Sequence, residues 1–366
     1  MNRLLPLLTA SVLAAACAPP TASSGAAPSP QSQGLHVSGI RLVNGSGSPV
    51  RLIGVNRSGT EYACIQGWGI FDGPQDEGSI AAMKSWHINA VRVPLNEDCW
   101  LGINGVSATY GGNAYRDAII AYVEFLHHAG LDVILDLHWT APGSARATMQ
   151  MPMPDMDHSP AFWTSVAQTF KDDNHIVFDL FNEPFADRAG LSPSAAWSCW
   201  ASGCTMSPGW GVSTSWQAAG MQALVQAVRS TGATQPLMVG GLRYANDLSG
   251  WDASRLDDPL SQLVASFHVY NFNACINVSC WSQQVERVAA DVPVVTGEIG
   301  ENDCAGDFIN TYMPWADAHG VSYLAWTWNT WDCRGGPALI TDYSGTPTAY
   351  GASYRTHLQT LAGGAP

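Results

Sequence analysis

The feature that most constrains this 366-residue chain is a repeated alternation of short apolar segments with longer amphipathic ones. The eight strand-like segments are residues 51–56, 88–94, 131–138, 176–181, 236–240, 263–269, 292–298 and 321–328. Helix-like segments lie between them or after the last, at residues 79–86, 115–129, 160–170, 216–230, 282–290, 308–319 and 350–361. Such alternation requires a parallel sheet. Eight units over this length predict an α/β fold, the closed (β/α)8 or TIM barrel.

A doubly wound open sheet is the alternative fold, but the first strand–helix turn lacks the Gly-x-Gly-x-x-Gly pattern. Before the first barrel strand, residues 35–43 alternate in polarity and Asn44-Gly45 marks a turn, which predicts a short N-terminal β-hairpin. Two connections, residues 140–159 and 186–213, follow the third and fourth strands. Connections this long are usually functional, and we expect them to wall a cleft.

The N-terminus has the pattern of a targeting segment. Residues 1–17 combine a positive start with an apolar run too short to span a bilayer, as in an export signal. Cleavage before Cys17 would give a lipid-anchored protein, whereas cleavage among the neighbouring alanines would give a secreted one, and both interpretations stay open. Residues 18–34 are rich in Pro, Ser and Ala and predict a disordered linker. The barrel domain is then residues 35–366, with no transmembrane helix in the mature chain.

Apart from Cys17, the chain has eight cysteines, and an even number in an exported protein indicates disulfides. Closeness in sequence and placement on neighbouring loops predict the pairs 64–99, 199–204, 275–280 and 304–333. A zinc site is poorly supported, because no Cys-x-x-Cys pair occurs and the histidines do not cluster.

Charge and aromatic content limit the partners of the chain. The net charge of −14 argues against a nucleic-acid or anionic-membrane partner, since either would require a basic patch. The chain contains 15 tryptophans, whose flat apolar faces suit neutral, hydroxyl-rich ligands such as sugars, although any single one is more often packing.

Two glutamates lie at the carboxyl ends of apolar strands: one directly follows its strand, and the other is the last residue of its strand. Glu183 lies directly after the strand at residues 176–181, where Pro184 stops the ladder, and Glu298 ends the strand at residues 292–298. In a barrel all strand ends face one mouth, so these carboxylates are expected to face each other there. Two facing carboxylates are the minimal equipment for glycoside hydrolysis, one as proton donor and one as nucleophile or base.

Other polar and aromatic residues fall at the same strand ends: Arg92, His138, Trp139, Asn182, His268, Tyr270, Trp326 and Trp328. A lone histidine is usually a satisfied core residue, and Arg92 could form a structural ion pair. Two histidines and two glutamates at strand ends together favour a site.

This ordered set, which includes Asn182-Glu183-Pro184 and His268-x-Tyr270, resembles glycoside hydrolase family 5, the cellulase family, over most of residues 50–335. The resemblance implies a retaining hydrolase with Glu183 as acid/base and Glu298 as nucleophile. It further implies that Tyr270, Arg92 and His138 support Glu298, and that Asn182 and His268 contact the substrate or the acid. It makes Trp328 the sugar platform at the cleavage point, with Trp326 a weaker candidate.

The substrate is less constrained than the reaction. We expect an endo-β-1,4-glucanase acting on a neutral polysaccharide, while a β-mannanase or an exo-β-glucosidase stays open on the same fold. Residues 241–251 predict a substrate-binding loop in which Tyr244, Asn246 and Trp251 serve sugar subsites. No metal or organic cofactor is expected. A non-catalytic carbohydrate-binding protein is the rival from another class, and an esterase is disfavoured because no Gly-x-Ser-x-Gly motif occurs.

Overall fold

The computed structural model describes residues 34–334 and 336–363. The expected export signal (residues 1–17), Cys17 and all of the expected linker except Gly34 lie outside these residues. Within the described part of the chain, no helix is long and apolar enough to cross a membrane.

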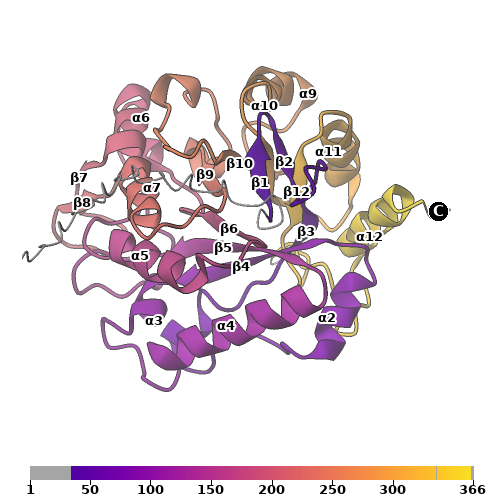
Figure 1. The fold of residues 1–366 in the computed structure, drawn as a ribbon, viewed down its shortest axis with the longest axis horizontal. Helices are drawn as coiled ribbons and strands as arrows, with labels where there is room; N and C mark the ends of the chain where they lie inside the picture. Colours follow the sequence, from indigo (N-terminus) through magenta and orange to yellow (C-terminus); the bar gives the residue numbers. More distant parts are fainter. Residues whose placement is uncertain (1–33, 335, 364–366) are drawn as a thin grey trace, which may run out of the picture.

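Eight parallel strands form a closed barrel, which confirms the predicted fold and excludes the open doubly wound sheet (Figure 1). In order around the barrel they are β3 (Ile53–Asn56), β4 (Ala90–Asn96), β5 (Asp132–Trp139), β6 (Ile176–Asp179), β9 (Leu237–Gly240), β10 (Leu263–Tyr270), β11 (Val294–Gly300) and β12 (Ser322–Ala325). Because all eight run in the same direction, their carboxyl ends meet at one face.

Helices surround the barrel (Figure 1). They include α2 (Glu77–Lys84), α4 (Asn113–His128), α5 (Ser159–Phe170), α7 (Met221–Arg229), α9 (Val278–Trp281), α10 (Arg287–Ala289), α11 (Asp307–Ala318) and α12 (Ala349–Leu361). A π-helical turn, Ser282–Glu286, joins α9 to α10. The helices cover the sheet through one apolar face: α4 buries Ile119, Tyr122, Val123 and Leu126, a spacing of three and four residues.

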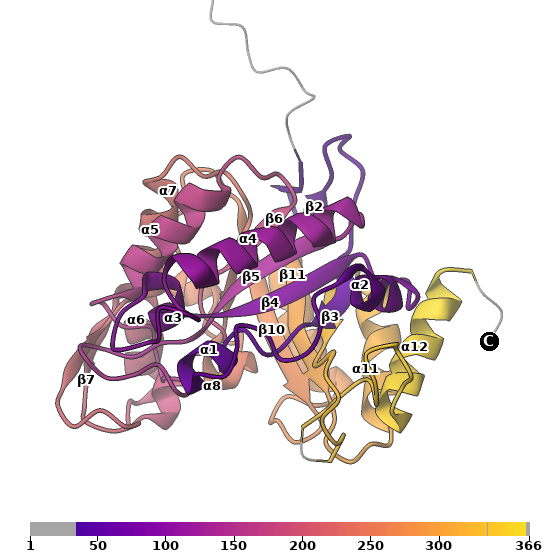
Figure 2. The ribbon, with the colours of Figure 1, turned by 90° about the horizontal axis from the view of Figure 1, so that it is seen from below.

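The N-terminal hairpin, β1 (His36–Ser38) and β2 (Arg41–Val43), plugs the amino end of the barrel. Leu42 of β2 and Leu35, the residue before β1, pack with one aliphatic layer supplied mainly by the barrel strands. Figure 2 shows this hairpin at the opposite end of the molecule from the short helices α1 (Ala63–Gln66) and α8 (Leu242–Ala245). The hairpin turns at Gly39, which has a positive φ, while Asn44-Gly45 lies in the following turn.

The connection after β6 is more regular than the sequence suggests. It contains η2 (Ala186–Arg188), α6 (Pro193–Ser202) and β7 (Cys204–Met206). The predicted helix at residues 216–230 begins too early, because Trp216–Ala218 is a strand, β8, that pairs antiparallel with β7. The helix α7 starts only after Gly220.

All four predicted disulfides are present: Cys64–Cys99, Cys199–Cys204, Cys275–Cys280 and Cys304–Cys333. Cys64–Cys99 joins α1, after β3, to α3 (Glu97–Leu101), after β4. The other three lie in connections that follow β6, β10, β11 and β12. The disulfides therefore brace the loops of the barrel rather than its strands.

Candidate active site

A pocket of about 560 Å³ opens where the strands β5, β6, β9, β10, β11 and β12 end. Its walls carry residues from all of these strand ends: His138, Gln150, Asn182, Glu183, Arg188, Arg243, Tyr244, Asn246, Tyr270, Phe272, Asn273, Ala274, Glu298, Trp326 and Pro337. Both predicted glutamates are among them.

The two glutamates face each other across this pocket. One carboxylate oxygen of Glu183, one of Glu298 and a ring nitrogen of His268 all lie within 4.8 Å of one another. Glutamate and histidine could also hold a metal ion in this arrangement, but carboxylates this close match the spacing, about 5 to 5.5 Å, with which two glutamates perform retaining hydrolysis. Inverting hydrolysis needs a spacing of about 6.5 Å or more to accommodate a water molecule.

Glu298 is almost fully buried and receives a donor on each of its oxygens. Arg92 Nη1 donates to Oε1 at 2.9 Å, and the Tyr270 hydroxyl donates to Oε2. Burial and the neighbouring Glu298 carboxylate raise the pKa of Tyr270 well above its usual value, so the phenol keeps the proton that it donates. Both donors stabilise negative charge on Glu298, as a nucleophile requires.

Arg92 is fully buried beneath the pocket, where its side chain contacts several polar groups at once. Besides Glu298, its guanidinium contacts Asp136 (3.0 Å), Asp179 (2.9 Å) and Asn182 Oδ1 (2.9 Å). Burial alone would lower the pKa of Arg92, but these surrounding carboxylates raise it, so the side chain remains charged. The rigid fork of the guanidinium thus fixes Glu298 and Asn182 relative to each other.

Glu183 has a different environment. Its Oε2 accepts from Gln150 Nε2 at 3.0 Å, and its Oε1 lies 3.0 Å from His268 Nδ1. Burial raises the pKa of Glu183, whereas the Gln150 hydrogen bond only partly opposes this. Burial also lowers the pKa of His268 to about 3, so the ring adjacent to Glu183 is neutral near neutral pH. Glu183 is therefore the carboxyl group suited to hold a proton and donate it.

Trp326 forms one wall of the pocket together with His138. The two rings are stacked at 13° with centroids 5.5 Å apart, and Trp326 remains partly exposed. His138 Nδ1 lies 2.6 Å from Asp136 Oδ2, which orients the imidazole. Burial lowers the pKa of His138 to about 4, so this ring is also neutral near neutral pH. The accessible indole face next to the glutamates can support a sugar ring.

Comparison with known proteins assigns the family. Residues 43–332 match the model of the family described as cellulase (glycosyl hydrolase family 5), which is well over half of the chain. The chain belongs to glycosyl hydrolase family 5.

Relatives of this family 5 chain include both glucanases and mannanases. A mannan endo-1,4-beta-mannosidase from Streptomyces lividans is 26% identical over 309 residues, covering 81% of this chain and 66% of its own length. Endoglucanase MaCel5A from Microbulbifer sp. (strain ALW1) is 27% identical over 150 residues, 41% of this chain and 26% of its own length. The chain thus spans just under two thirds of the first of these curated relatives and about a quarter of the second.

Solved structures share the fold. The beta-glucanase SdGluc5_26A from Saccharophagus degradans in complex with cellotetraose has a TM-score of 0.67 at 19% identity, covering 90% of this chain and 93% of the other. The catalytic domain of a mannanase from Streptomyces sp. SirexAA-E has a TM-score of 0.60 at 23% identity, covering 91% and 92%.

Two of the predicted tryptophans lie outside the pocket of this family 5 chain. Trp328 is fully buried and packs edge-on against Trp86, at 4.9 Å between ring centroids, so the prediction of a sugar platform there is wrong. The physical reason is that β12 ends at Ala325, and strand alternation no longer keeps Trp328 on the face of Trp326. Trp251 is also buried, against Trp200 at 5.6 Å, and it belongs to the core rather than to a subsite.

The remaining predicted residues lie in or near the pocket. Tyr244 and Asn246 line it, and the Tyr244 ring stacks on Phe185 with centroids 4.5 Å apart. Asn246 is buried and donates to the His268 carbonyl at 2.7 Å, so it holds the loop against β10. Trp139 is partly exposed and lies outside the pocket walls, next to Tyr62.

Several contributing residues were missed in the sequence. Asp136 and Asp179 share Arg92 with Glu298, and Gln150 reaches Glu183 from the long loop after β5. The two aspartates interrupt otherwise apolar strands, and this signal could have identified them as interior polar groups. Gln150 lies in a loop without periodicity, and nothing in the sequence singles it out.

Two glycines in β11 allow the site to close around Glu298. A Cβ atom on Gly297 would lie 2.8 Å from His268 Nε2, and one on Gly300 would lie 2.6 Å from the Tyr270 ring. Any larger residue at either position would push His268 or Tyr270 away from the glutamates. Glycine at positions 297 and 300 is therefore a steric requirement of the site.

Proposed function

We propose that this chain is a retaining glycoside hydrolase that cleaves within β-1,4-linked chains of neutral hexoses. The observation that carries the proposal is the pair of facing glutamates, whose oxygens lie within 4.8 Å and whose surroundings differ. One carboxyl is held by a guanidinium and a phenol, and the pKa of the other is raised by burial.

The reaction would proceed in two displacements. Glu183 donates its proton to the glycosidic oxygen while Glu298 attacks the anomeric carbon, which releases the leaving sugar and forms a glycosyl ester on Glu298. Glu183, now ionised, then removes a proton from a water molecule that attacks the same carbon and frees Glu298. Trp326 would support the sugar ring at the cleavage point, and Asn182 would hold a hydroxyl beside Glu183.

Two polymers have specific support. β-1,4-Mannan is favoured by the relative that matches 81% of this chain, a mannan endo-1,4-beta-mannosidase. β-1,4-Glucan is favoured by the curated endoglucanase, which matches a shorter part of the chain. The decisive experiment measures reducing-sugar release from carboxymethylcellulose, mannan, glucomannan, xyloglucan and xylan side by side, together with product lengths. We expect a ladder of oligosaccharides from one of the two backbones; no release from any polymer would refute the proposed activity.

We also propose that the protein acts outside the cytoplasm, either secreted or anchored through Cys17. The targeting pattern of residues 1–17 and the four disulfides support this proposal. Mass spectrometry of the mature N-terminus distinguishes the two forms, since an acylated Cys17 would carry the added mass of its lipid chains. An uncleaved Met1 in the mature protein would contradict export.

A further inference from the structure

Gln150, in the long loop after β5, makes two contacts with the proposed acid, Glu183. Its side-chain nitrogen Nε2 lies 2.9 Å from the main-chain carbonyl oxygen of Glu183 and 3.0 Å from Glu183 Oε2. A carbonyl oxygen has no hydrogen to donate, so the amide must turn its NH2 group toward Glu183. Both hydrogens of that group are then donated to one residue, and the amide holds the main chain and the carboxyl group of Glu183 together.

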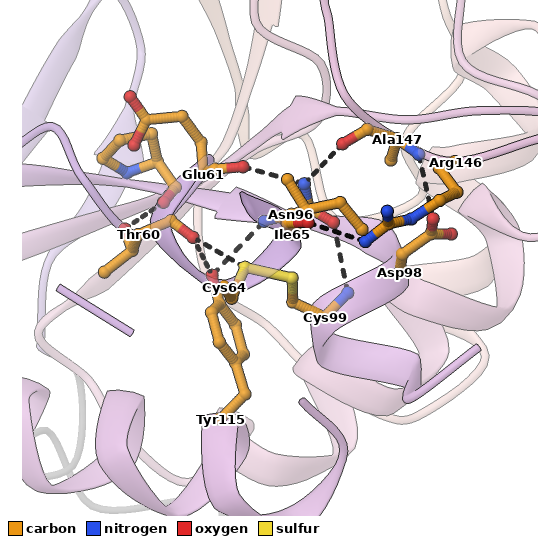
Figure 3. The surroundings of a disulfide bond; sticks show 11 residues. Thr60, Glu61, Cys64, Ile65, Asn96, Asp98, Cys99, Tyr115, Arg146 and Ala147 are labelled. Carbon is orange, nitrogen blue, oxygen red and sulfur yellow. Dashed lines mark hydrogen bonds between the residues drawn. A yellow bond between two sulfur atoms is a disulfide. The ribbon is translucent and has the colours of Figure 1, made fainter. Parts of the chain in front are cut away.

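The loop is fixed on the side that precedes this amide, as Figure 3 shows. The main-chain N–H of Ala147 donates to Asp98 Oδ2 at 2.9 Å, and its carbonyl accepts from Asn96 Nδ2 at 2.8 Å. Both of these side chains are fully buried. The neighbouring Arg146 donates to the Ile65 carbonyl at 2.6 Å. These bonds attach the loop to the end of β4 and to the helices α1 and α3, which a disulfide joins to each other.

The side of the loop that follows the amide is fixed as well. The main-chain N–H of Phe185 donates to the Pro152 carbonyl at 2.9 Å, so the loop bonds to the chain two residues beyond Glu183. The side chain of Met151 is buried in the hydrophobic core. Because the loop is held on both sides, Gln150 presents its amide in one place and loses little further conformational entropy when it bonds to Glu183.

The bond to Oε2 affects proton transfer because an amide N–H can donate but cannot accept. Oε2 therefore serves as the acceptor oxygen, and the protonated form of Glu183 carries its hydrogen on Oε1, which lies 3.0 Å from His268 Nδ1. When Glu183 gives up this proton, the bond from Gln150 becomes charge-assisted and hence stronger. Burial raises the pKa of Glu183, and the Gln150 hydrogen bond opposes this rise by stabilising the ionised form.

Other titratable and charged groups also face Glu183. They are Arg92 from β4, Asp136 and His138 from β5, Tyr244 from α8, His268 and Tyr270 from β10, and Glu298 from β11. In the described part of the chain, the hydrogen bonds of the Gln150 amide go to Glu183 alone. Replacing Gln150 therefore changes one interaction of Glu183 and leaves the hydrogen bonds and ion pairs of the other groups in place.

We propose that Gln150 is a positioning residue for the proposed hydrolysis, which holds the carboxyl group of Glu183 and assists its ionisation. In the first displacement, the proton passes from Oε1 to the glycosidic oxygen as the bond to the leaving sugar breaks, and the amide stabilises the negative charge that Oε2 gains. In the second displacement, the same bond holds the carboxylate that accepts a proton from water. The proposal rests on the proposed function, because it concerns the acid of that reaction.

The pH dependence of kcat/KM on a β-1,4-linked oligosaccharide tests this role, since its basic limb reports the ionisation of the acid in the free enzyme. Gln150→Met keeps the length of the side chain but removes the donor. We expect its basic limb to move up by about one pH unit and its plateau to fall about three- to tenfold, because Glu183 becomes a weaker acid. Gln150→Glu adds a like charge and should move the limb further up.

Gln217→Met is the matched control. It makes the same change on β8, where the exposed side chain donates to Thr205 at 2.8 Å, and it should alter neither the plateau nor the basic limb. On a dinitrophenyl glycoside, whose leaving group needs no proton, Gln150→Met should lose less than about twofold in kcat/KM. An unmoved basic limb, or equal losses on both substrates, would mean that Gln150 only maintains the structure and would overturn the proposal.

A direct titration separates this proposal from the proposed activity. Carbon-13 NMR of labelled glutamate carboxyl groups follows the ionisation of Glu183 without substrate, and Glu183→Gln identifies its resonance. We expect the titration midpoint to lie about one pH unit higher in Gln150→Met than in the wild type. The same midpoint in both proteins would overturn the role of Gln150 and leave the hydrolase intact. A raised midpoint in a protein that cleaves no glycoside would support the effect of Gln150 on Glu183 and refute the activity.

Discussion

Replacing Glu183 by alanine tests the division of labour between the two glutamates. In the proposed mechanism this change removes the proton donor, and none of the described residues around Glu183 can take its place. Gln150 presents only an amide, and burial lowers the pKa of His268 to about 3, so it carries no spare proton near neutral pH. Glu298, the proposed nucleophile, keeps its bonds to Arg92 and Tyr270 and remains in place.

The magnitude depends on the leaving group. General acid catalysis contributes about 10²- to 10⁴-fold, or about 3 to 5 kcal/mol, when the departing oxygen is an unactivated sugar hydroxyl. A dinitrophenolate leaves without protonation, so its release should lose less than about tenfold. The quantity to compare is kcat/KM, because it reports the first displacement and is unaffected by slow hydrolysis of the glycosyl ester.

The assay measures kcat/KM for wild type and Glu183→Ala on an oligosaccharide and on its dinitrophenyl glycoside. Azide should raise kcat of the variant on the aryl substrate, since this small anion can occupy the space left by the carboxyl group and needs no general base. Glu183→Gln, which keeps the shape of the side chain, is the matched control and should show the same dependence on leaving group. Equal losses on both substrates would refute the assignment of Glu183 as the acid.

Three further predictions follow from the buried groups. Tyr270→Phe removes a charge-assisted hydrogen bond to Glu298, and steady-state kinetics should show kcat lowered about 10- to 150-fold, corresponding to about 1.5 to 3 kcal/mol; an unchanged kcat would contradict this role. Arg92→Met leaves the buried Asp136 and Asp179 without their ion-pair partner and should lower the free energy of unfolding by about 3 to 5 kcal/mol in urea titrations. A loss below about 1 kcal/mol would contradict the stabilising role of Arg92. Burial raises the pKa of Glu61 to about 8, so the folded state retains a proton that the unfolded chain releases above about pH 4.5, and stability should fall as the pH rises toward 8. Glu61→Gln should make this fall smaller, and an identical pH profile in both proteins would refute the effect.

The sequence was sufficient for the barrel and for the residues that strand ends bring together. Glu183, Glu298, His138 and Tyr270 share a pocket because parallel strands deliver their carboxyl ends to one face, a property that alternation alone reveals. The four disulfides were also predictable, because each cysteine pairs with a near neighbour along the chain or on an adjacent loop.

The wrong predictions concern residues whose positions depend on tertiary contacts, which a local sequence pattern does not reveal. Trp326 and Trp328 are two residues apart, a spacing that would place both side chains on one face of a strand. Because β12 ends at Ala325, Trp326 faces the pocket whereas Trp328 packs against Trp86. Trp251 lies in the expected binding loop, but its ring turns toward Trp200 in the core. Trp216 was assigned to a helix because its pairing partner, β7, is too short to be recognised before the fold is known.

The central claim is that Glu183 and Glu298 are close enough for one of them to attack the sugar directly. Proton NMR of the first product formed from a β-linked oligosaccharide tests this claim, because it identifies the anomer before mutarotation. A spacing within 4.8 Å fits the retaining arrangement rather than the separation of about 6.5 Å or more at which a carboxylate activates water on the opposite face, so the product should appear first as the β-anomer. An initial α-anomer would mean that water attacks from the opposite face, and the assignment of Glu298 as nucleophile would be wrong.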